Sequence, residues 1–147
     1  MKKNILILIV AAFALLPVSL YAQSNKMLGK WYTIDEDGNR KSIVVITKNP
    51  NGMFEGTIEK LLTGDPDRKC VNCTGAEKNK TLKGMKIIRS LREDGLKLTG
   101  GTILDPANGK VYNCTVSLDK KSGDLKVRGS LDKSGIIGRN QVWKRAE

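Results

Sequence analysis

Apolar and polar residues alternate along much of this chain, and the alternation is clearest between Gly100 and Leu118. In the second half of that stretch, one set of alternate residues is mainly apolar and the other is polar: Tyr112, Cys114, Val116 and Leu118 against Asn113, Thr115 and Ser117. A period of two with one polar face is typical of an antiparallel strand packed on one side only. The stretch therefore predicts two strands joined by a turn.

The residues Asp105–Gly109 between these two strands are those of a tight turn. Pro106 has a φ near the value that the first central turn position needs, and the Asp105 carboxylate can cap the turn. Gly109 supplies the positive φ that leads a type I turn into the second strand. Earlier in the hairpin, the pair Gly100–Gly101 lies inside a strand, where it predicts a bulge or a sharp bend.

The same pattern of short strands and turn signals recurs over the rest of the chain. It predicts further strands at Gly29–Ile34, Ser42–Thr47, Met53–Leu62, Met85–Leu91, Leu125–Leu131 and Ile137–Trp143. The polar stretch Thr63–Gly84 breaks the pattern and is expected to be a long connection. About eight strands in sequence, with no amphipathic helix, predict an all-β fold. A single antiparallel up-and-down barrel of about eight strands is the favoured architecture, and an open sandwich is the alternative.

The N-terminal segment Met1–Ala22 has the organisation of a signal peptide. Two lysines precede the unbroken apolar run Ile5–Leu16, which is shorter than the roughly 20 residues that a membrane-spanning helix needs. Cleavage is expected after Ala22, with Ser24 as the alternative. Residues 23–147 then form one domain with no other long apolar run, and we expect it to be exported to the periplasm or secreted.

The charge of the mature chain is strongly positive. Without the two leader lysines, 24 basic residues face 15 acidic ones, a net charge of about +9. The lysines are spread over loops and outward strand positions and form no dense run, so a solvated surface is the favoured interpretation. Nucleic acid is not an expected partner of an exported chain. If the charge has a partner, an anionic component of the cell envelope is the better candidate.

The three cysteines, Cys70, Cys73 and Cys114, are the most distinctive residues. The Cys70–Cys73 pair is open to three interpretations: a structural disulfide, a redox-active dithiol or half of a zinc site. An oxidising compartment favours a disulfide. The close pair Cys70–Cys73 is slightly favoured, and a bond from Cys114 to either loop cysteine is nearly as well supported.

The sequence contains no set of residues that predicts catalysis. There is no histidine, which excludes Ser-His-Asp and Cys-His nucleophile systems and histidine-ligated metal sites. No phosphate-binding or dinucleotide fingerprint occurs either. We therefore predict no catalytic residue, no metal and no cofactor.

Three residues of the last predicted strand alternate onto one face: Arg139, Gln141 and Trp143. If this face points inward, polar groups lie beside an indole, as in a pocket for a small ligand. If it points outward, Trp143 covers a seam and the polar groups are solvated. The sequence leaves both possibilities open.

Five separated motifs occur in one order: Gly29–Trp31, Cys70–Cys73, Gly100–Cys114, Lys126–Gly129 and Gly138–Trp143. Together they resemble a family of small exported bacterial domains of unknown function. The resemblance covers nearly the whole mature chain. It implies a lipocalin-like or calycin-like barrel in the cell envelope, and it implies no activity.

The resemblance also implies a role for two residues at the ends of the domain. In lipocalin-like barrels a Gly-x-Trp motif opens the first strand, and a basic residue of the last strand stacks on its indole. Trp31 and Arg139 fit these places here. Such a stack contributes about 0.5–2 kcal/mol and is expected to close the barrel rather than to bind a ligand.

The leading functional hypothesis is a non-enzymatic exported barrel that binds a small, partly apolar molecule or an envelope component. The expected lining residues are Trp31, Tyr112, Arg139, Gln141 and Trp143. The alternative is a structural or interaction module with a filled barrel and a basic surface. A thiol-dependent or metal-dependent enzyme is a weaker third hypothesis.

Overall fold

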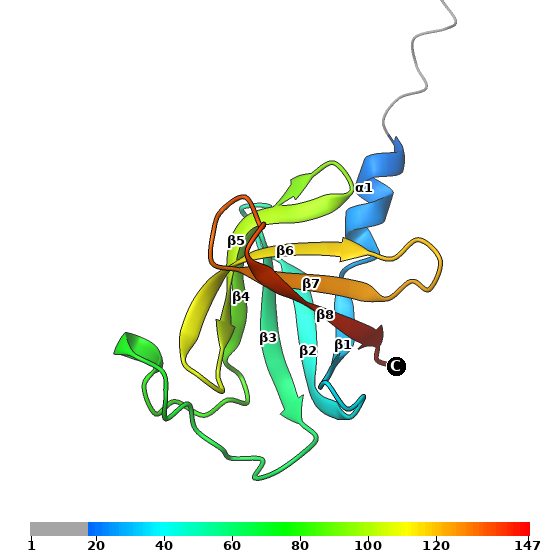
Figure 1. The fold of residues 1–147 in the computed structure, drawn as a ribbon. Coiled ribbons are helices and arrows are strands. Elements are labelled where there is room, and N and C mark those ends of the chain that lie inside the picture. The colour runs from blue at the N-terminus through cyan, green and yellow to red at the C-terminus, as the bar shows by residue number, and fades with distance from the viewer. Residues whose placement is uncertain (1–17) are drawn as a thin grey trace, which may run out of the picture.

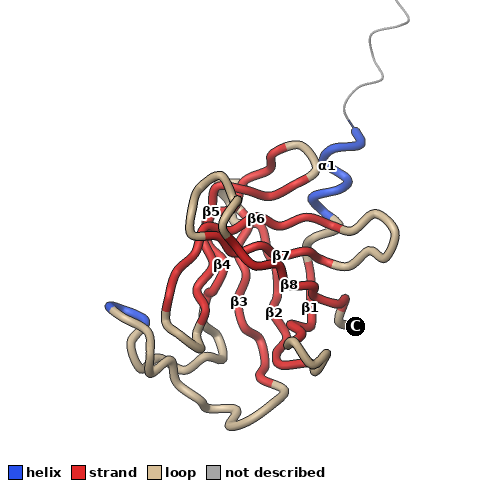
Figure 2. The backbone as a smooth tube through the Cα atoms, viewed as in Figure 1, coloured by secondary structure: helices blue, strands red, loops and turns tan. Residues whose placement is uncertain are grey.

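Eight antiparallel strands, each hydrogen-bonded to the next, close into an up-and-down barrel in the computed structural model, which describes residues 18–147 (Figures 1 and 2). Their bounds are β1 Gly29–Ile34, β2 Arg40–Lys48, β3 Phe54–Leu61, β4 Lys86–Asp94, β5 Lys97–Asp105, β6 Lys110–Leu118, β7 Leu125–Ser130 and β8 Gly138–Arg145. The predicted all-β barrel of about eight strands is confirmed. The predicted signal peptide lies mostly outside the described residues.

The β5–β6 hairpin forms as its turn residues predict. The Gly109 amide donates to the Asp105 carbonyl at 2.8 Å, and one Asp105 carboxylate oxygen accepts from the Ala107 amide at 2.9 Å. Gly109 has a φ of +73°, which glycine adopts without strain. The cross-strand pair Asp105 and Lys110 starts the ladder directly beside the turn.

The predicted irregularity at Gly100–Gly101 is confirmed. The β5–β6 register shifts between Leu98 and Gly101, and Gly100 has a φ of +75°. At Gly101 a Cβ would lie 2.2 Å from the carbonyl oxygen of Arg89, so β4 and β5 approach each other more closely than any side chain allows. Glycine is therefore required where these two strands bend around the barrel.

The short helix α1, Val18–Asn25, lies beside one end of the barrel, which we call the closed end. No helix was predicted from the sequence in this segment. Below the helix, Met27 is fully buried, and its carbonyl accepts a 2.9 Å hydrogen bond from Trp31 Nε1. Figure 1 shows α1 and the C-terminus on the same side of the molecule, away from the long β3–β4 connection. No helix of the described residues is long and apolar enough to cross a membrane.

A guanidinium does stack on the Trp31 indole, but it belongs to Arg145 and not to Arg139. The Arg145 guanidinium carbon lies 3.8 Å from the ring centroid, and Nη1 of the same residue donates to the Leu28 carbonyl at 2.7 Å. The strand register explains why Arg145 stacks on the indole, because β1 and β8 pair Trp31 with Arg145. Arg139 lies six residues earlier in β8, about 20 Å away along an extended strand.

The seam between β1 and β8 is the shortest ladder of the barrel. These strands pair only at Trp31 with Arg145 and at Tyr32 with Lys144, near the closed end. On its other side, β8 pairs with β7 along six consecutive residues. The opposite end, which we call the open end, carries the β1–β2, β3–β4, β5–β6 and β7–β8 connections, so the β1–β8 ladder stops before it reaches that end.

The long connection between β3 and β4 carries the Cys70–Cys73 disulfide, as favoured from the sequence. It folds back on itself through the isolated bridge of Lys69 with Thr81, and it contains a short 3-10 helix, Gly75–Glu77. The connection docks on the β5–β6 turn, where Asn72 Nδ2 donates to the Ala107 carbonyl at 2.8 Å. Because both cysteines are oxidised, they cannot serve as thiolate ligands, and no cluster of three Cys, Asp or Glu side chains suited to a metal occurs within residues 18–147.

Cys114 is a free thiol inside the barrel, and we expect it to be unreactive. It is 2 % exposed, and burial raises its pKa from the usual 9.0 to about 12. Ellman's reagent at pH 8 should detect no thiol in the native protein and one in denaturant. Because the unfolded thiol ionises first, stability should be unaffected below pH 9 and should fall as the pH rises from 9 toward 12. Rapid labelling of the native protein at pH 8 would contradict this assignment.

Candidate functional site at the open end of the barrel

The interior near the closed end is filled with side chains. The two tryptophans and the largest apolar residues are at most 2 % exposed: Trp31, Trp143, Phe54, Met27, Ile46, Ile88, Leu91, Leu98 and Leu125. Large side chains that are buried this completely are typical of a packed protein core rather than of a ligand pocket. Trp31 therefore belongs to the packed core, and a site inside the barrel has to lie beyond Trp143, toward the open end.

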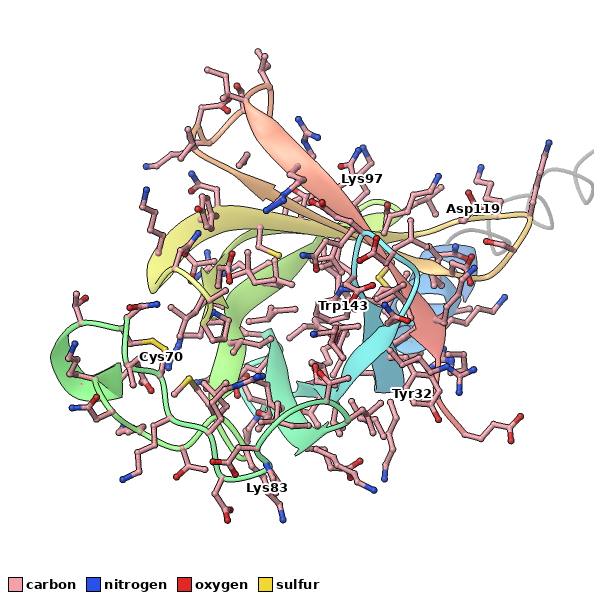
Figure 3. The ribbon with its side chains drawn as sticks, turned by 60° about the horizontal axis from the view of Figure 1, so that its bottom comes forward. Tyr32, Cys70, Lys83, Lys97, Asp119 and Trp143 are labelled. Atoms are coloured by element: carbon pink, nitrogen blue, oxygen red, sulfur yellow. A yellow bond between two sulfur atoms is a disulfide. The ribbon has the colours of Figure 1, made fainter. Side chains whose placement is uncertain are left out.

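The strand register shows that the alternating face of β8 points inward. Trp143 pairs with Leu125, Gln141 with Val127 and Arg139 with Gly129, and the paired Leu125 and Val127 are both core residues. Directly opposite residues of antiparallel strands share one face of the sheet. Of the two arrangements left open by the sequence, the structure therefore has the inward one. Figure 3 places Trp143 inside the ring of strands.

Exposure increases along this inward face from Trp143 toward the open end. Trp143 is 1 % exposed, whereas Gln141 and Arg139 are exposed although they share its face. Trp143 Nε1 donates to Gln141 Oε1 at 3.0 Å. The indole N–H is thus satisfied by a side chain that itself contacts solvent. On this face, the exposed residues therefore begin directly above the tryptophan.

Arg139 lies at the rim of the open end and spans the seam. Its Nη1 is 3.0 Å from Oε1 of Glu36 in the β1–β2 connection. Their side chains are 69 % and 87 % exposed, so water screens this pair and it contributes little to stability. The guanidinium is consequently available to an anionic or polar group without loss of a strong internal contact.

Tyr112 is half-buried on the inward face of β6 and lies near Gly129 of β7. A Cβ built on Gly129 would be 3.5 Å from the Tyr112 Cβ, so the glycine leaves space beside the ring. The Tyr112 hydroxyl accepts a 3.0 Å hydrogen bond from Asn108 Nδ2 in the β5–β6 turn. The predicted residues Tyr112, Arg139 and Gln141 therefore lie on the inner face of the open half and Trp143 lies directly below them, whereas Trp31 lies in the closed half.

Two hydroxyl side chains on β1 and β2, those of Thr33 and Ser42, were not predicted as part of the site. Thr33 of β1 and Ser42 of β2 face each other, with their oxygens 2.7 Å apart, and Ser42 is 8 % exposed. The signal was present in the sequence, because Ser42 continues the alternation of the buried Val44 and Ile46. A polar residue on a core face has to find a partner, and it marks the more polar half of the interior.

The β7–β8 connection holds apolar side chains in solvent at the open end. The Asp132 carboxylate accepts hydrogen bonds from the Ser134 hydroxyl and from the Ile137 and Ile136 amides, and these bonds hold its pKa well below the usual range. Ile136 and Ile137 nevertheless remain 79 % and 60 % exposed, and Leu131 is 70 % exposed. The open end therefore has an ordered, partly apolar rim.

The fold is also that of a solved structure, protein HP1028 from Helicobacter pylori, which is described as belonging to the lipocalin family. The two share 24% sequence identity over 82% of each chain, with a TM-score of 0.71. This likeness shows that the barrel is lipocalin-like, as the sequence motifs implied. No match was found among the curated proteins.

The model of one protein family matches residues 29–145, which is nearly the whole barrel from the start of β1 to the end of β8. The family is described as an uncharacterized protein conserved in bacteria, DUF2147. The match agrees with the five motifs on which the resemblance rested. On this evidence the chain belongs to the DUF2147 family of bacterial proteins, and its barrel is lipocalin-like.

Proposed function

We propose that this protein is an exported, non-enzymatic barrel that binds a small, partly apolar molecule at its open end. The observation that carries the proposal is the exposed amide of Gln141, which lies on the inward face and satisfies the buried indole of Trp143. A ligand that enters the open end would meet this layer first. Below it, the packed core leaves the ligand no way further into the barrel.

The chemistry of the open half favours a ligand with both polar and apolar parts. The Gln141 amide and the Thr33–Ser42 hydroxyl pair offer hydrogen bonds, and Arg139 offers a positive charge at the rim. The Tyr112 ring and the exposed rim residues of the β7–β8 connection offer apolar contact. A few polar groups placed within an apolar wall are typical of small-molecule sites.

Export is part of the proposal, and α1 bears on the cleavage site. Ser24 is 3 % exposed, and its hydroxyl donates to Glu93 Oε1 at 2.7 Å, which ties the helix to the end of β4. Cleavage after Ala22 would keep this contact, whereas cleavage after Ser24 would remove it. We therefore favour Ala22 as the last residue of the signal peptide and the periplasm, or the medium, as the destination.

The interaction module is the second candidate, because the closed half of the barrel is filled and offers no internal space. In that case the basic outer surface would dock on an anionic component of the cell envelope. The thiol-dependent enzyme is disfavoured, since Cys70 and Cys73 are bonded and the buried Cys114 has a pKa of about 12. A thiol that stays protonated at neutral pH is a poor nucleophile.

The proposal predicts that Gln141→Ala weakens binding of the uncharged fluorescent probe N-phenyl-1-naphthylamine. This probe has aromatic rings and a single N–H, which Gln141 Oε1 can accept. Loss of one hydrogen bond of about 0.5–1.5 kcal/mol corresponds to a roughly 2- to 12-fold higher Kd. Lys121→Ala, at an exposed position in the β6–β7 turn of the closed end, is the control and should leave the Kd unchanged.

Native mass spectrometry of the protein from its own envelope fraction tests the proposal without a chosen probe. We expect a bound mass that is lost on denaturation. No bound mass, together with equal probe affinities for Gln141→Ala and Lys121→Ala, would contradict binding at the open end and would favour the interaction module.

A further inference from the structure

A second surface of the barrel has the form of a binding site, and it lies outside the wall rather than inside. The long β3–β4 connection folds over the outer face of β4, β5 and β6 and leaves two adjoining hollows there. Glu77 and Arg89 line both hollows, which therefore lie side by side, and we call the two together the outer groove. In Figure 3 Cys70 and Lys83 mark this connection at the periphery, away from Trp143.

One arm of the outer groove is mainly apolar and has a volume of about 140 Å³. Its apolar lining comes from Cys73, Ile87, Leu104 and Val111. Val111 is 62 % exposed, which is high for a valine on the outer face of a strand and leaves its side chain open to a ligand. An apolar cavity of about 150 Å³ holds a benzene molecule, so this arm suits an apolar group of that size.

An irregularity in β4 puts two consecutive residues, Lys86 and Ile87, on the outer face of the barrel. The β3–β4 pairing runs from Gly56 with Ile88 to Thr57 with Lys86, so one residue, Ile87, is skipped. Ile88 remains in the core at 0 % exposure, while Ile87 and Arg89 line the groove outside. Ile87, Ile88 and Arg89 alternate as in any strand, so the bulge acts on Lys86, which also lies outside, against Glu55, and lines the groove.

The other arm of the outer groove is cationic, more open and about 390 Å³ in volume. Four basic side chains line it against the single carboxylate of Glu77: Lys80, Lys83, Lys86 and Arg89. Thr81, Gly84 and Met85 complete the lining. This excess of positive charge is local, in contrast to the dispersed lysines over the rest of the chain.

Two of these cations are already paired, and two are left for a ligand. Arg89 lies 2.8 Å from the Glu77 carboxylate, and Lys86 lies 2.6 Å from Glu55. Lys80 is only loosely held, at 3.8 Å from Glu77. Lys83 forms no ion pair with any residue in the described part of the chain, so it and Lys80 can turn toward an anion.

The wall that the connection contributes is fixed in place. The Cys70–Cys73 disulfide closes its tip, and Lys78 Nζ donates to the Val71 carbonyl at 2.5 Å. Asn72 rests on the β5–β6 turn, where a Cβ on Gly109 would lie 1.8 Å from the Asn72 carbonyl oxygen. A wall held by covalent and backbone contacts is preorganised, which lowers the entropy cost of binding.

We propose that the outer groove binds a small organic anion whose phosphate or carboxylate group sits beside Lys83 and Lys80 and whose apolar portion, about the size of a benzene ring, packs on Val111 and Ile87. The two arms adjoin at Glu77 and Arg89, and the bound molecule would span this border. Glu77 does not repel the anion strongly, because the Arg89 guanidinium pairs with its carboxylate at 2.8 Å. This site lies outside the barrel wall, and Tyr112, Arg139, Gln141 and Trp143 are not among its lining residues.

Nuclear magnetic resonance titration of the purified full barrel with three probes tests the proposal. Benzyl phosphate carries both parts, inorganic phosphate carries only the anion, and benzyl alcohol carries only the ring. We expect benzyl phosphate to shift the amides of Glu77, Thr81 and Gly84 and to bind at least fivefold more tightly than either of the other probes. Its affinity should fall in high salt, because part of the attraction is electrostatic.

Matched variants separate the two arms. Lys83→Gln should weaken benzyl phosphate at least threefold and leave benzyl alcohol unchanged, whereas Lys120→Gln in the exposed β6–β7 turn should change neither. Val111→Ser should weaken both aromatic probes, and Val142→Ser, a 41 % exposed valine on β8, should weaken neither. Equal effects of Lys83→Gln and Lys120→Gln, or tighter binding of inorganic phosphate than of benzyl phosphate, would overturn the proposal.

Discussion

Replacing Trp31 by alanine is expected to lower the free energy of unfolding by about 3–5 kcal/mol, the usual cost of truncating a buried tryptophan. Trp31 is fully buried at the closed end, under the stacked guanidinium of Arg145. Its loss would leave a cavity, remove the stack and orphan the Met27 carbonyl that accepts from Nε1. Urea denaturation followed by circular dichroism measures the change, since far-ultraviolet dichroism does not depend on the tryptophan.

Trp31→Phe is the matched control for this experiment. Phenylalanine keeps an aromatic face for Arg145 and much of the buried volume, but it cannot donate to the Met27 carbonyl. We expect a loss of about 1–2 kcal/mol, clearly smaller than that of the alanine variant. If Trp31→Ala cost less than about 1 kcal/mol, the indole could not be the packed element that closes the barrel.

Replacing Gly109 by alanine is expected to release the β3–β4 connection from the barrel. The new Cβ would lie 1.8 Å from the Asn72 carbonyl oxygen and 2.9 Å from the Cys73 amide nitrogen. Neither contact can be relieved by rotation of a side chain, because both partners are backbone atoms. We expect the free energy of unfolding to fall by about 3 kcal/mol or more, and trypsin to cut the released connection at Lys69 or Lys78.

Gly123→Ala is an unusually close control for Gly109→Ala. Both glycines end a turn at a φ of +73°, but nothing lies within 4 Å of a Cβ at Gly123. The cost of placing alanine in the left-handed region, about 1 kcal/mol, is therefore common to both variants. The difference between them isolates the clash with the connection. Identical stability and identical trypsin patterns would show that the connection does not rest on Gly109.

The Gly109→Ala and Gly123→Ala variants also distinguish the two proposed binding sites. Gly109→Ala should abolish tight binding of benzyl phosphate, because the released connection supplies one wall of the outer groove. It should leave binding of N-phenyl-1-naphthylamine at the open end largely intact, since Gln141 and Trp143 lie on β8. If Gly109→Ala abolished binding of both probes, the result would indicate a general loss of structure rather than two separate sites.

Local patterns in the sequence determined most of the architecture. Period-two alternation between turn signals predicted most of the eight strands, and the apolar, β-branched run Ser42–Thr47 predicted another. The turn chemistry at Asp105–Gly109 and the glycine pair Gly100–Gly101 predicted the hairpin and its bend. Proximity favoured the Cys70–Cys73 bond over a bond from Cys114. Each of these inferences depends on neighbours that are close along the chain.

The tertiary structure decided what depends on closure and register. Alternation placed Arg139, Gln141 and Trp143 on one face, but only the pairing of β8 with β7 showed that this face points inward. The choice of Arg145 over Arg139 as the partner of Trp31 follows from the β1–β8 register, and the position of Lys86 in the outer groove follows from the residue skipped in β4. The physical reason is that side-chain period two is a local property of a strand, whereas register and bulges are set jointly by all the strands that close the barrel.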